Sequence, residues 1–296
     1  LDRVLATVEA TAAPGTIKQY QVIAGQLRRE FGNDYDPAAL TKAQAEEWLH
    51  RKRGKKREPW SPRTQAQKCA LAGRVWKEAG VAEHPWREAV TPDVRATRFA
   101  FLQPEEWRVL AGKVNGLPVA AALALGCLAG LRLREVIYLR PEVDVDMERR
   151  RLKIQARDGA HPWRPKTERG ERSLRIGDEL LSILRAHIDS GYSGGRYLIR
   201  TPGPDRPIHP STLARWTEEA FTSAGIRYGR DGDGLTFHSL RHTFASWLVQ
   251  RDVQLMKVAK LLGDTELEVA RTYGHLLPED LDRAVDLVNS IAGGSA

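Results

Sequence analysis

The chain has 296 residues, of which 42% are hydrophobic and 28% charged, a composition typical of a globular protein large enough for two domains. No apolar run reaches the roughly 18 to 20 residues of a membrane span, and no export signal opens the chain. Lysine and arginine total 46 against 38 acidic residues, giving a net charge of +8. This excess favours nucleic acid as the partner, with an anionic membrane surface as the alternative.

The two cysteines, Cys69 and Cys127, lie in separate apolar segments without metal-site spacing. They are predicted to be buried thiols in a reducing compartment, and their number and spacing favour neither a disulfide framework nor a zinc site. The first residue is Leu1, not methionine, which is compatible with a trimmed N-terminal segment.

The first 90 residues show only helical patterns. Apolar residues recur near helical spacing from 17 to 27, and Gly32, which follows Phe31, is expected to end this helix. Thr41 is expected to cap a second helix, and Ser61 followed by Pro62 to begin a third.

A basic run, RKRGKKRE, lies between the second and third of these helices at residues 51–58. Such a run can simply be a solvated surface, but in a chain with excess positive charge we expect it to contact phosphate. The predicted DNA contacts are Arg51, Lys52, Arg53, Lys55, Lys56 and Arg57, together with Arg164 and Arg169 further along the chain.

Residues 91–101 lack a clean period and are predicted to be a linker. A second domain then begins with a helix whose first turn contains Pro104, Glu105 and Glu106. An apolar helix pair broken near Gly130 follows, and then two strand-like segments joined by the loop RDGAHPWRPKTERG. Helical patterns continue to the end, so the fold class is mainly α with a small antiparallel β-sheet.

Two arginines of this second domain stand in unusual settings. Arg132, in GLRLRE, precedes Glu135 by three residues, so the carboxylate can orient the guanidinium. In FHSLRHTFASWL, His238 and Arg241 fall one turn apart near a helix N-terminus, which forms a natural anion pocket. Taken singly, the first feature is better explained by a surface Arg–Glu pair, and a packed core histidine beside a surface arginine explains the second equally well.

Two more residues are ordinary alone and informative together. Lys166 lies in the loop between the strands, and Tyr273 lies 32 residues after Arg241 in the segment LLGDTELEVARTYGH. The ordered set GLRxxE, hairpin lysine, HxLRH and LLG-x9-Tyr resembles the tyrosine recombinase (phage integrase) family. The resemblance covers essentially the whole chain, with HSLRHTFAS as its most specific part.

The resemblance implies a helical core-binding DNA-binding domain at 1–90 and a catalytic domain at 102–278. Arg132 and Arg241 would hold the scissile phosphate, with His238 assisting and Glu135 and His275 in support. Tyr273 would be the nucleophile and Lys166 the proton donor to the leaving 5′-oxygen, its pKa lowered by Arg164 and Arg169. Two guanidiniums can stabilise this transfer, so no metal or other cofactor is implied.

The same resemblance implies double-stranded DNA held in a clamp between the two domains and a tetramer assembled on that DNA. The C-terminal segment 279–296 carries an apolar helical stripe. It can pack on its own domain or, as the resemblance favours, dock on a neighbouring protomer. The expected location is the cytoplasm of a bacterium or of a phage-infected cell.

Asp264 departs from the family pattern, which usually has histidine or tryptophan after LLG to donate a hydrogen bond to the phosphate. An ionised carboxylate cannot donate and repels a phosphodiester. Thr265 and Glu268 form a T-x-x-E capping box, so Asp264 is expected to face the helix N-terminus or a nearby arginine.

Several functions remain open at this point. The leading one is a site-specific integrase of a mobile element, and a chromosome-dimer or transposon-resolving recombinase would use the same chemistry. A DNA-binding relative that has lost catalysis is the alternative from another class, and a type IB topoisomerase shares the tyrosine nucleophile.

Overall fold

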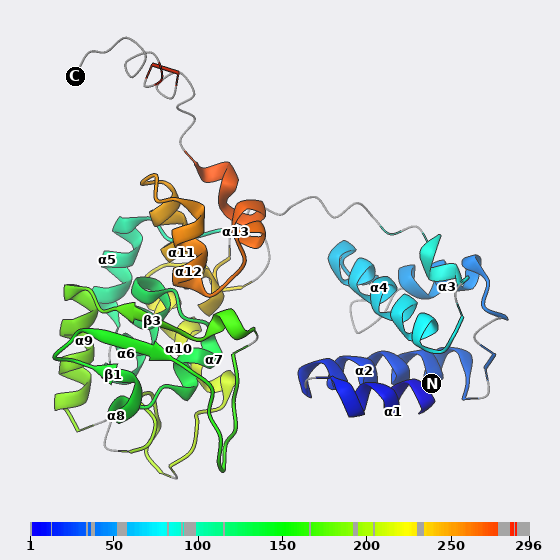
Figure 1. Ribbon diagram of the computed structural model, residues 1–296, viewed down its shortest axis with the longest axis horizontal. Coiled ribbons are helices and arrows are strands. Elements are labelled where there is room, and N and C mark those ends of the chain that lie inside the picture. Colours follow the sequence, from blue (N-terminus) through cyan, green and yellow to red (C-terminus); the bar gives the residue numbers. More distant parts are fainter. Residues whose placement is uncertain are drawn as a thin grey trace. The chain divides into compact units, whose positions relative to one another are not determined.

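The chain folds into two compact units, residues 1–98 and 99–296 (Figure 1). The computed structural model describes residues 2–12, 14–33, 35–36, 39–51, 58–81, 83–89, 91, 99–114, 116–165, 167–191, 195–203, 205–229, 234–277, 285–286 and 288. Most of the predicted linker and of the predicted C-terminal docking helix therefore lies outside the described residues. In the described part, no helix combines the length and apolar character needed to cross a bilayer.

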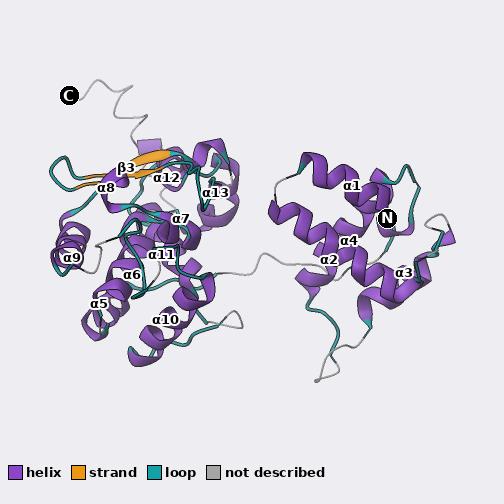
Figure 2. Ribbon diagram, turned by 90° about the horizontal axis from the view of Figure 1, so that it is seen from below, coloured by secondary structure: helices purple, strands orange, loops and turns teal. Residues whose placement is uncertain are grey.

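The described elements of the N-terminal unit are helices joined by loops (Figure 2). Its elements are α1 (Asp2–Thr11), α2 (Pro14–Phe31), α3 (Lys42–His50), α4 (Pro62–Glu78) and the short 3-10 helix η2 (Pro85–Arg87). The predicted caps are confirmed, since Thr41 accepts from the Gln44 backbone at the start of α3 and Ser61 from the Thr64 backbone at the start of α4. These caps satisfy amide groups that a helix start leaves unpaired.

Tryptophans fill the core of this unit. Trp86 meets Trp48 and Trp76 edge-on, with ring centroids 5.5 Å apart in both pairs. Because α3, α4 and η2 each supply one of these rings, the cluster fixes the three elements to one another.

The C-terminal unit is a helical assembly with one small sheet. Its helices are α5 (Pro104–Lys113), α6 (Leu117–Ala129), α7 (Leu133–Tyr138), α8 (Pro141–Asp144), α9 (Asp178–Asp189), α10 (Pro210–Ser223), α11 (Phe237–Val249), α12 (Leu255–Leu262), α13 (Glu266–Tyr273) and the 3-10 helices η3 (Glu168–Gly170) and η4 (Gly274–Leu276). Helix α6 packs against α9, α10 and α11, which explains why its sequence is apolar nearly all round.

The sheet contains β1 (Val145–Asp146), β2 (Arg151–Ile154) and β3 (Arg172–Arg175) in that order, all antiparallel. Leu152 pairs with Leu174, and both face the core. The predicted mainly α fold with a small antiparallel sheet is confirmed. Lys166, in the connection between β2 and β3, lies outside the described residues.

Two glycines allow the close approaches on which the site depends. Gly130 ends α6 at φ 64°, where a Cβ would lie 2.6 Å from the Phe244 ring. Gly263 ends α12 at φ 66°, where a Cβ would lie 2.7 Å from the Arg169 carbonyl oxygen. Both positions therefore need glycine for conformation and for space.

Candidate active site

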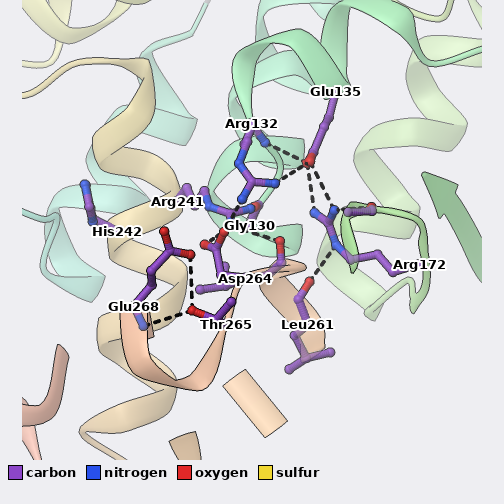
Figure 3. A network of polar contacts seen from close by, with 12 residues as sticks. Gly130, Arg132, Glu135, Arg172, Arg241, His242, Leu261, Asp264, Thr265 and Glu268 are labelled. Atoms are coloured by element: carbon purple, nitrogen blue, oxygen red, sulfur yellow. Dashed lines mark hydrogen bonds and ion pairs between the residues drawn. The ribbon is translucent and has the colours of Figure 1, made fainter. Parts of the chain in front are cut away.

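Two guanidiniums and one carboxylate meet at a corner of the C-terminal unit (Figure 3). One oxygen of Asp264 accepts from Arg132 and the other accepts from Arg241. Arg132 precedes α7, Arg241 lies on the second turn of α11, and Asp264 lies in the turn between α12 and α13. Side-chain exposure is 21% for Arg132, 25% for Asp264 and 3% for Arg241, so solvent reaches the cluster from one side.

Arg241 is held by the ends of two helices. Its Nη1 donates to the Gly130 carbonyl (2.7 Å) and its Nη2 to the Leu262 carbonyl (2.8 Å), the last acceptors of α6 and α12. A cation at these termini is favoured because both helix dipoles place negative charge there. Burial and the neighbouring Arg132 lower the pKa of Arg241, and Asp264 opposes that shift; a guanidinium nevertheless stays protonated.

Arg132 is oriented by Glu135, as the sequence predicted. The buried carboxylate accepts from the Arg132 backbone N–H and from its Nη1, both at 2.9 Å. On its other side, Glu135 accepts two bonds from Arg172, at 2.8 and 3.1 Å. Burial alone would raise the pKa of Glu135, but the bonds from these two arginines outweigh it and hold the pKa below its usual range.

Arg172 is a site residue that sequence reasoning missed. Its remaining bonds go to the Leu261 carbonyl (2.8 Å) and the Gly170 carbonyl (2.9 Å), so it ties β3 to α7 and to the end of α12. The alternation of β3 held a signal, because Arg172 shares the inward face with Leu174. An arginine on a core-facing strand position requires a buried partner, which here is Glu135.

Tyr273 is the last residue of α13 and is 4% exposed. Its hydroxyl lies 2.8 Å from Nδ1 of His242, and the Phe99 ring meets it edge-on with centroids 5.1 Å apart. Burial raises the pKa of Tyr273; Arg241 and Arg132 lower it, and Asp264 raises it further. In the DNA-free protein the phenol is therefore protonated.

His242 was also missed, although it stands one turn after His238 on the same helix face. Its ring stacks on Phe99 at 4.5 Å and meets His238 edge-on at 4.7 Å. Burial, His238 and Arg241 lower the pKa of His242 to about 4, against an opposing effect of Asp264. A neutral imidazole at Nδ1 can accept the Tyr273 proton, which a cation cannot.

This pKa makes stability depend on pH. Because the folded pKa of His242 lies below the ordinary 6.5, the unfolded chain binds its proton first, and stability present above pH 6.5 is lost as pH falls toward 4. Between pH 7 and 4.5, the loss assigned to His242 is roughly 2 to 3 kcal/mol. Urea unfolding of wild type and His242→Asn at both pH values measures it, because the pH-dependent loss should be smaller in the variant. An equal loss in both proteins would contradict this assignment.

Four more of the predicted site residues are described, and all four are exposed. His238 and His275 are exposed, and the His275 ring meets Phe99 edge-on at 5.9 Å. Arg164 pairs with Asp158 at 3.2 Å on the surface, and Arg169 is exposed.

Of the predicted DNA-contacting run, only Arg51 is described. It pairs with Glu30 (2.6 Å) and Glu47 (3.0 Å). Lys52, Arg53, Lys55, Lys56 and Arg57 lie outside the described residues.

The Asp264 turn has one feature that the sequence predicted and one that it did not. Thr265 caps α13 by accepting from the Glu268 backbone (3.2 Å). The Glu268 carboxylate accepts from the Thr265 hydroxyl (3.4 Å) instead of the Thr265 backbone N–H, so the predicted box is half formed. Of the two orientations expected for Asp264, the structure has the one toward arginine.

No three histidine, cysteine or acidic side chains within the described ranges are grouped to hold a metal ion. The cluster instead offers two convergent guanidiniums, an arrangement that suits the binding of an oxyanion.

Comparison with known proteins gives a consistent result. The sequence profile of the phage integrase family matches residues 101–280. A tyrosine recombinase of Thermosipho africanus is 27% identical over 69% of this chain and 67% of its own length. The integrase of Salmonella phage P22 is 27% identical over 69% of this chain, and a XerC-like recombinase of Caldanaerobacter subterraneus is 25% identical over 68%. These matches span only 51% and 57% of those two relatives.

Solved structures show the same fold. The integrase of transposon Tn1549, in complex with transposon right end DNA, superposes with a TM-score of 0.73 at 15% identity, covering 98% of both chains. A lambda integrase dimer bound to a core site superposes with a TM-score of 0.69 at 15% identity, covering 92% of this chain and 93% of that one. The family profile covers more than half of the chain, and the chain therefore belongs to the phage integrase family, the family of the tyrosine recombinases.

Proposed function

We propose that the protein is a site-specific DNA recombinase that cleaves and rejoins DNA strands through a 3′-phosphotyrosyl intermediate. The observation that carries the proposal is the convergence of Arg132 and Arg241 in the unit that also holds the buried Tyr273. Phosphoryl transfer builds negative charge on the non-bridging phosphate oxygens. Guanidinium pairs placed in advance stabilise that charge without reorganisation.

In the proposed cleavage, the Tyr273 oxygen attacks phosphorus, a new O–P bond forms, and the bond from phosphorus to the 5′-oxygen breaks. The phenol proton passes to a neighbouring base, for which His242 is placed at 2.8 Å. The departing 5′-oxygen takes a proton from Lys166. Reversal with a different 5′-hydroxyl rejoins the strand, so this scheme needs neither ATP nor a metal.

The relatives support a biological setting for this chemistry. Integrases of a phage and of a transposon favour an element-encoded integrase acting on a double-stranded DNA site. The XerC-like relative favours chromosome-dimer or element resolution as the second candidate. Both would proceed through a Holliday junction in a DNA-bound tetramer, in the cytoplasm of a bacterial or phage-infected cell. Residues 1–90 would be the core-binding domain and 102–278 the catalytic domain.

The test uses nicked suicide substrates with randomised sequence around the nick. Wild type should form a covalent protein–DNA adduct, and sequencing the captured DNA would identify the site. Tyr273→Phe removes only the nucleophilic oxygen, so the adduct should disappear while binding to the captured site remains. Tyr228→Phe is the matched control, because the Tyr228 ring meets Phe221 edge-on in the loop that follows α10.

Two results would reject the proposal. Site-specific binding without any wild-type adduct would indicate a DNA-binding relative that does not cleave. Adducts at arbitrary sequences, together with relaxation of supercoiled plasmid, would indicate a topoisomerase.

A further inference from the structure

Asp264 occupies the position at which an external oxyanion would meet both guanidiniums. One carboxylate oxygen faces Arg132 and the other faces Arg241, so the group bridges the pair as two phosphate oxygens would (Figure 3). A carboxylate and a phosphate offer guanidinium the same two-oxygen face. We infer that Asp264 is an internal competitor of the scissile phosphate, which must displace it before cleavage. This inference rests on the proposed function and concerns the regulation of the same site.

The charges of the cluster support competition. Arg132, Arg172 and Arg241 supply three positive charges and Glu135 and Asp264 two negative ones, so one positive charge remains. Adding a phosphodiester to this cluster would bring the net charge to zero. The dianionic transition state would bring it to one negative charge. Displacing Asp264 restores the second positive charge that such a transition state needs.

Burial and hydrogen bonding distinguish Asp264, the proposed competitor, from Glu135, which makes structural ion pairs. Glu135 is 1% exposed, accepts four hydrogen bonds and has no route to solvent. Asp264 is 25% exposed and lies in a turn outside the helices, so its side chain can rotate into water. Its backbone N–H remains bonded to the Ala259 carbonyl (3.1 Å), so the turn can stay in place while the carboxylate leaves.

Competition would also set a threshold for cleavage. The phosphodiester takes the place of the Asp264 carboxylate at the arginines, so the Tyr273 phenol exchanges one anionic neighbour for another and keeps both cationic ones. Only DNA held firmly enough to displace Asp264 would therefore be cleaved.

The experiment compares variants at this one position. Asp264→Asn keeps the shape and removes the charge, Asp264→His introduces a hydrogen-bond donor, and Asp264→Glu keeps the charge. If the internal pair is favoured about tenfold over the open state, its removal should improve apparent phosphate affinity by about tenfold. Single-turnover adduct formation on the captured suicide substrate should accordingly reach half-maximal rate at a lower DNA concentration for Asn and His. The Glu variant should not show this gain.

Asp189→Asn is the matched control, because it removes an exposed negative charge of the same unit at the C-terminal end of α9. Losing any negative charge should strengthen DNA binding somewhat, and this effect appears in both Asn variants. Only the additional gain in apparent DNA affinity of Asp264→Asn over Asp189→Asn supports competition. The inference is overturned if Asp264→Asn is folded by circular dichroism and needs as much DNA as the control, or more, to reach its half-maximal rate.

A second measurement does not depend on cleavage. Inorganic phosphate should raise the thermal midpoint of DNA-free Asp264→Asn more than that of wild type or Asp189→Asn, because only that variant has lost its internal anion. Equal shifts in all three proteins would reject competition even if they form adducts. If no protein forms an adduct, the proposed function fails, and this phosphate comparison still decides the role of Asp264. A variant that folds only when phosphate is present would support the inference.

Discussion

Replacing Arg241 by lysine is expected to slow single-turnover adduct formation by a factor of about 100 to 1000, the usual cost of losing one donor to a transition-state oxyanion. Site binding should persist, since it depends on contacts spread over the DNA backbone. Lysine keeps the positive charge, so the decrease in rate would measure the contribution of the guanidinium's donor geometry. The rate is measured on the nicked suicide substrate at saturating DNA.

The reason lies in how many acceptors one side chain serves. Arg241 reaches the Gly130 carbonyl through Nη1, and the Leu262 carbonyl and Asp264 through Nη2. A planar fork can keep both carbonyls and still direct donors at a phosphate, whereas one ammonium presents its three donors from a single point. A lysine would either remain at the helix ends or reach the phosphate.

Arg215→Lys provides the matched control, because Arg215 makes only an exposed i,i+4 pair with Glu219 among its described contacts. That variant should cleave at the wild-type rate. An Arg241→Lys protein with wild-type cleavage and normal thermal stability would show that charge alone suffices, and would remove Arg241 from the phosphate-holding role.

The elements of the fold were largely predictable because their signals are local. Thr41 and Ser61 mark helix starts because their hydroxyls accept from the nearest unpaired amides, and Pro104 marks one because its φ is fixed and it has no N–H to leave unpaired. Gly130 marks the end of α6 because only glycine fits its left-handed conformation against Phe244. The inward Leu152 and Leu174 followed from alternation in the two strands.

The site was predictable only in part, because its decisive contacts join distant segments. The order of motifs identified Arg132, Arg241 and Tyr273, and the local spacing identified Glu135. That Asp264 binds both arginines could not be derived, since Arg132 lies 132 positions away and two side-chain orientations satisfied the local chemistry equally. The contact between His242 and Tyr273, 31 positions apart, likewise depends on how α13 packs on α11.

Glu135→Gln is expected to lower the free energy of unfolding by about 3 to 5 kcal/mol, because it leaves the buried Arg172 and the half-buried Arg132 without their shared anion. Glu135 accepts from Arg132 on one side and Arg172 on the other. A neutral amide matches only part of this donor set and would turn its own NH₂ toward a guanidinium. The measurement is urea unfolding at pH 7 with circular dichroism.

The same substitution should flatten the acid side of the stability profile. Since the folded pKa of Glu135 is lowered, its contribution is present above the ordinary carboxyl pKa and is lost as pH falls through the folded value. The glutamine variant has no such group, so its stability should fall less steeply in that range. Glu219→Gln, which breaks the exposed pair with Arg215, should cost less than about 1 kcal/mol.

Glu135→Gln and Glu219→Gln together compare the loss of a buried carboxylate with the loss of a carboxylate in an exposed ion pair. If Glu135→Gln proves as mild as Glu219→Gln, then Arg132 and Arg172 are satisfied by other groups, and Glu135 does not set the arginine geometry. If the loss is large and adduct formation also slows at denaturant-free pH 7, Glu135 acts by positioning Arg132. It lies on the side of that arginine opposite Asp264, so it would fix the guanidinium while Asp264 and the phosphate exchange.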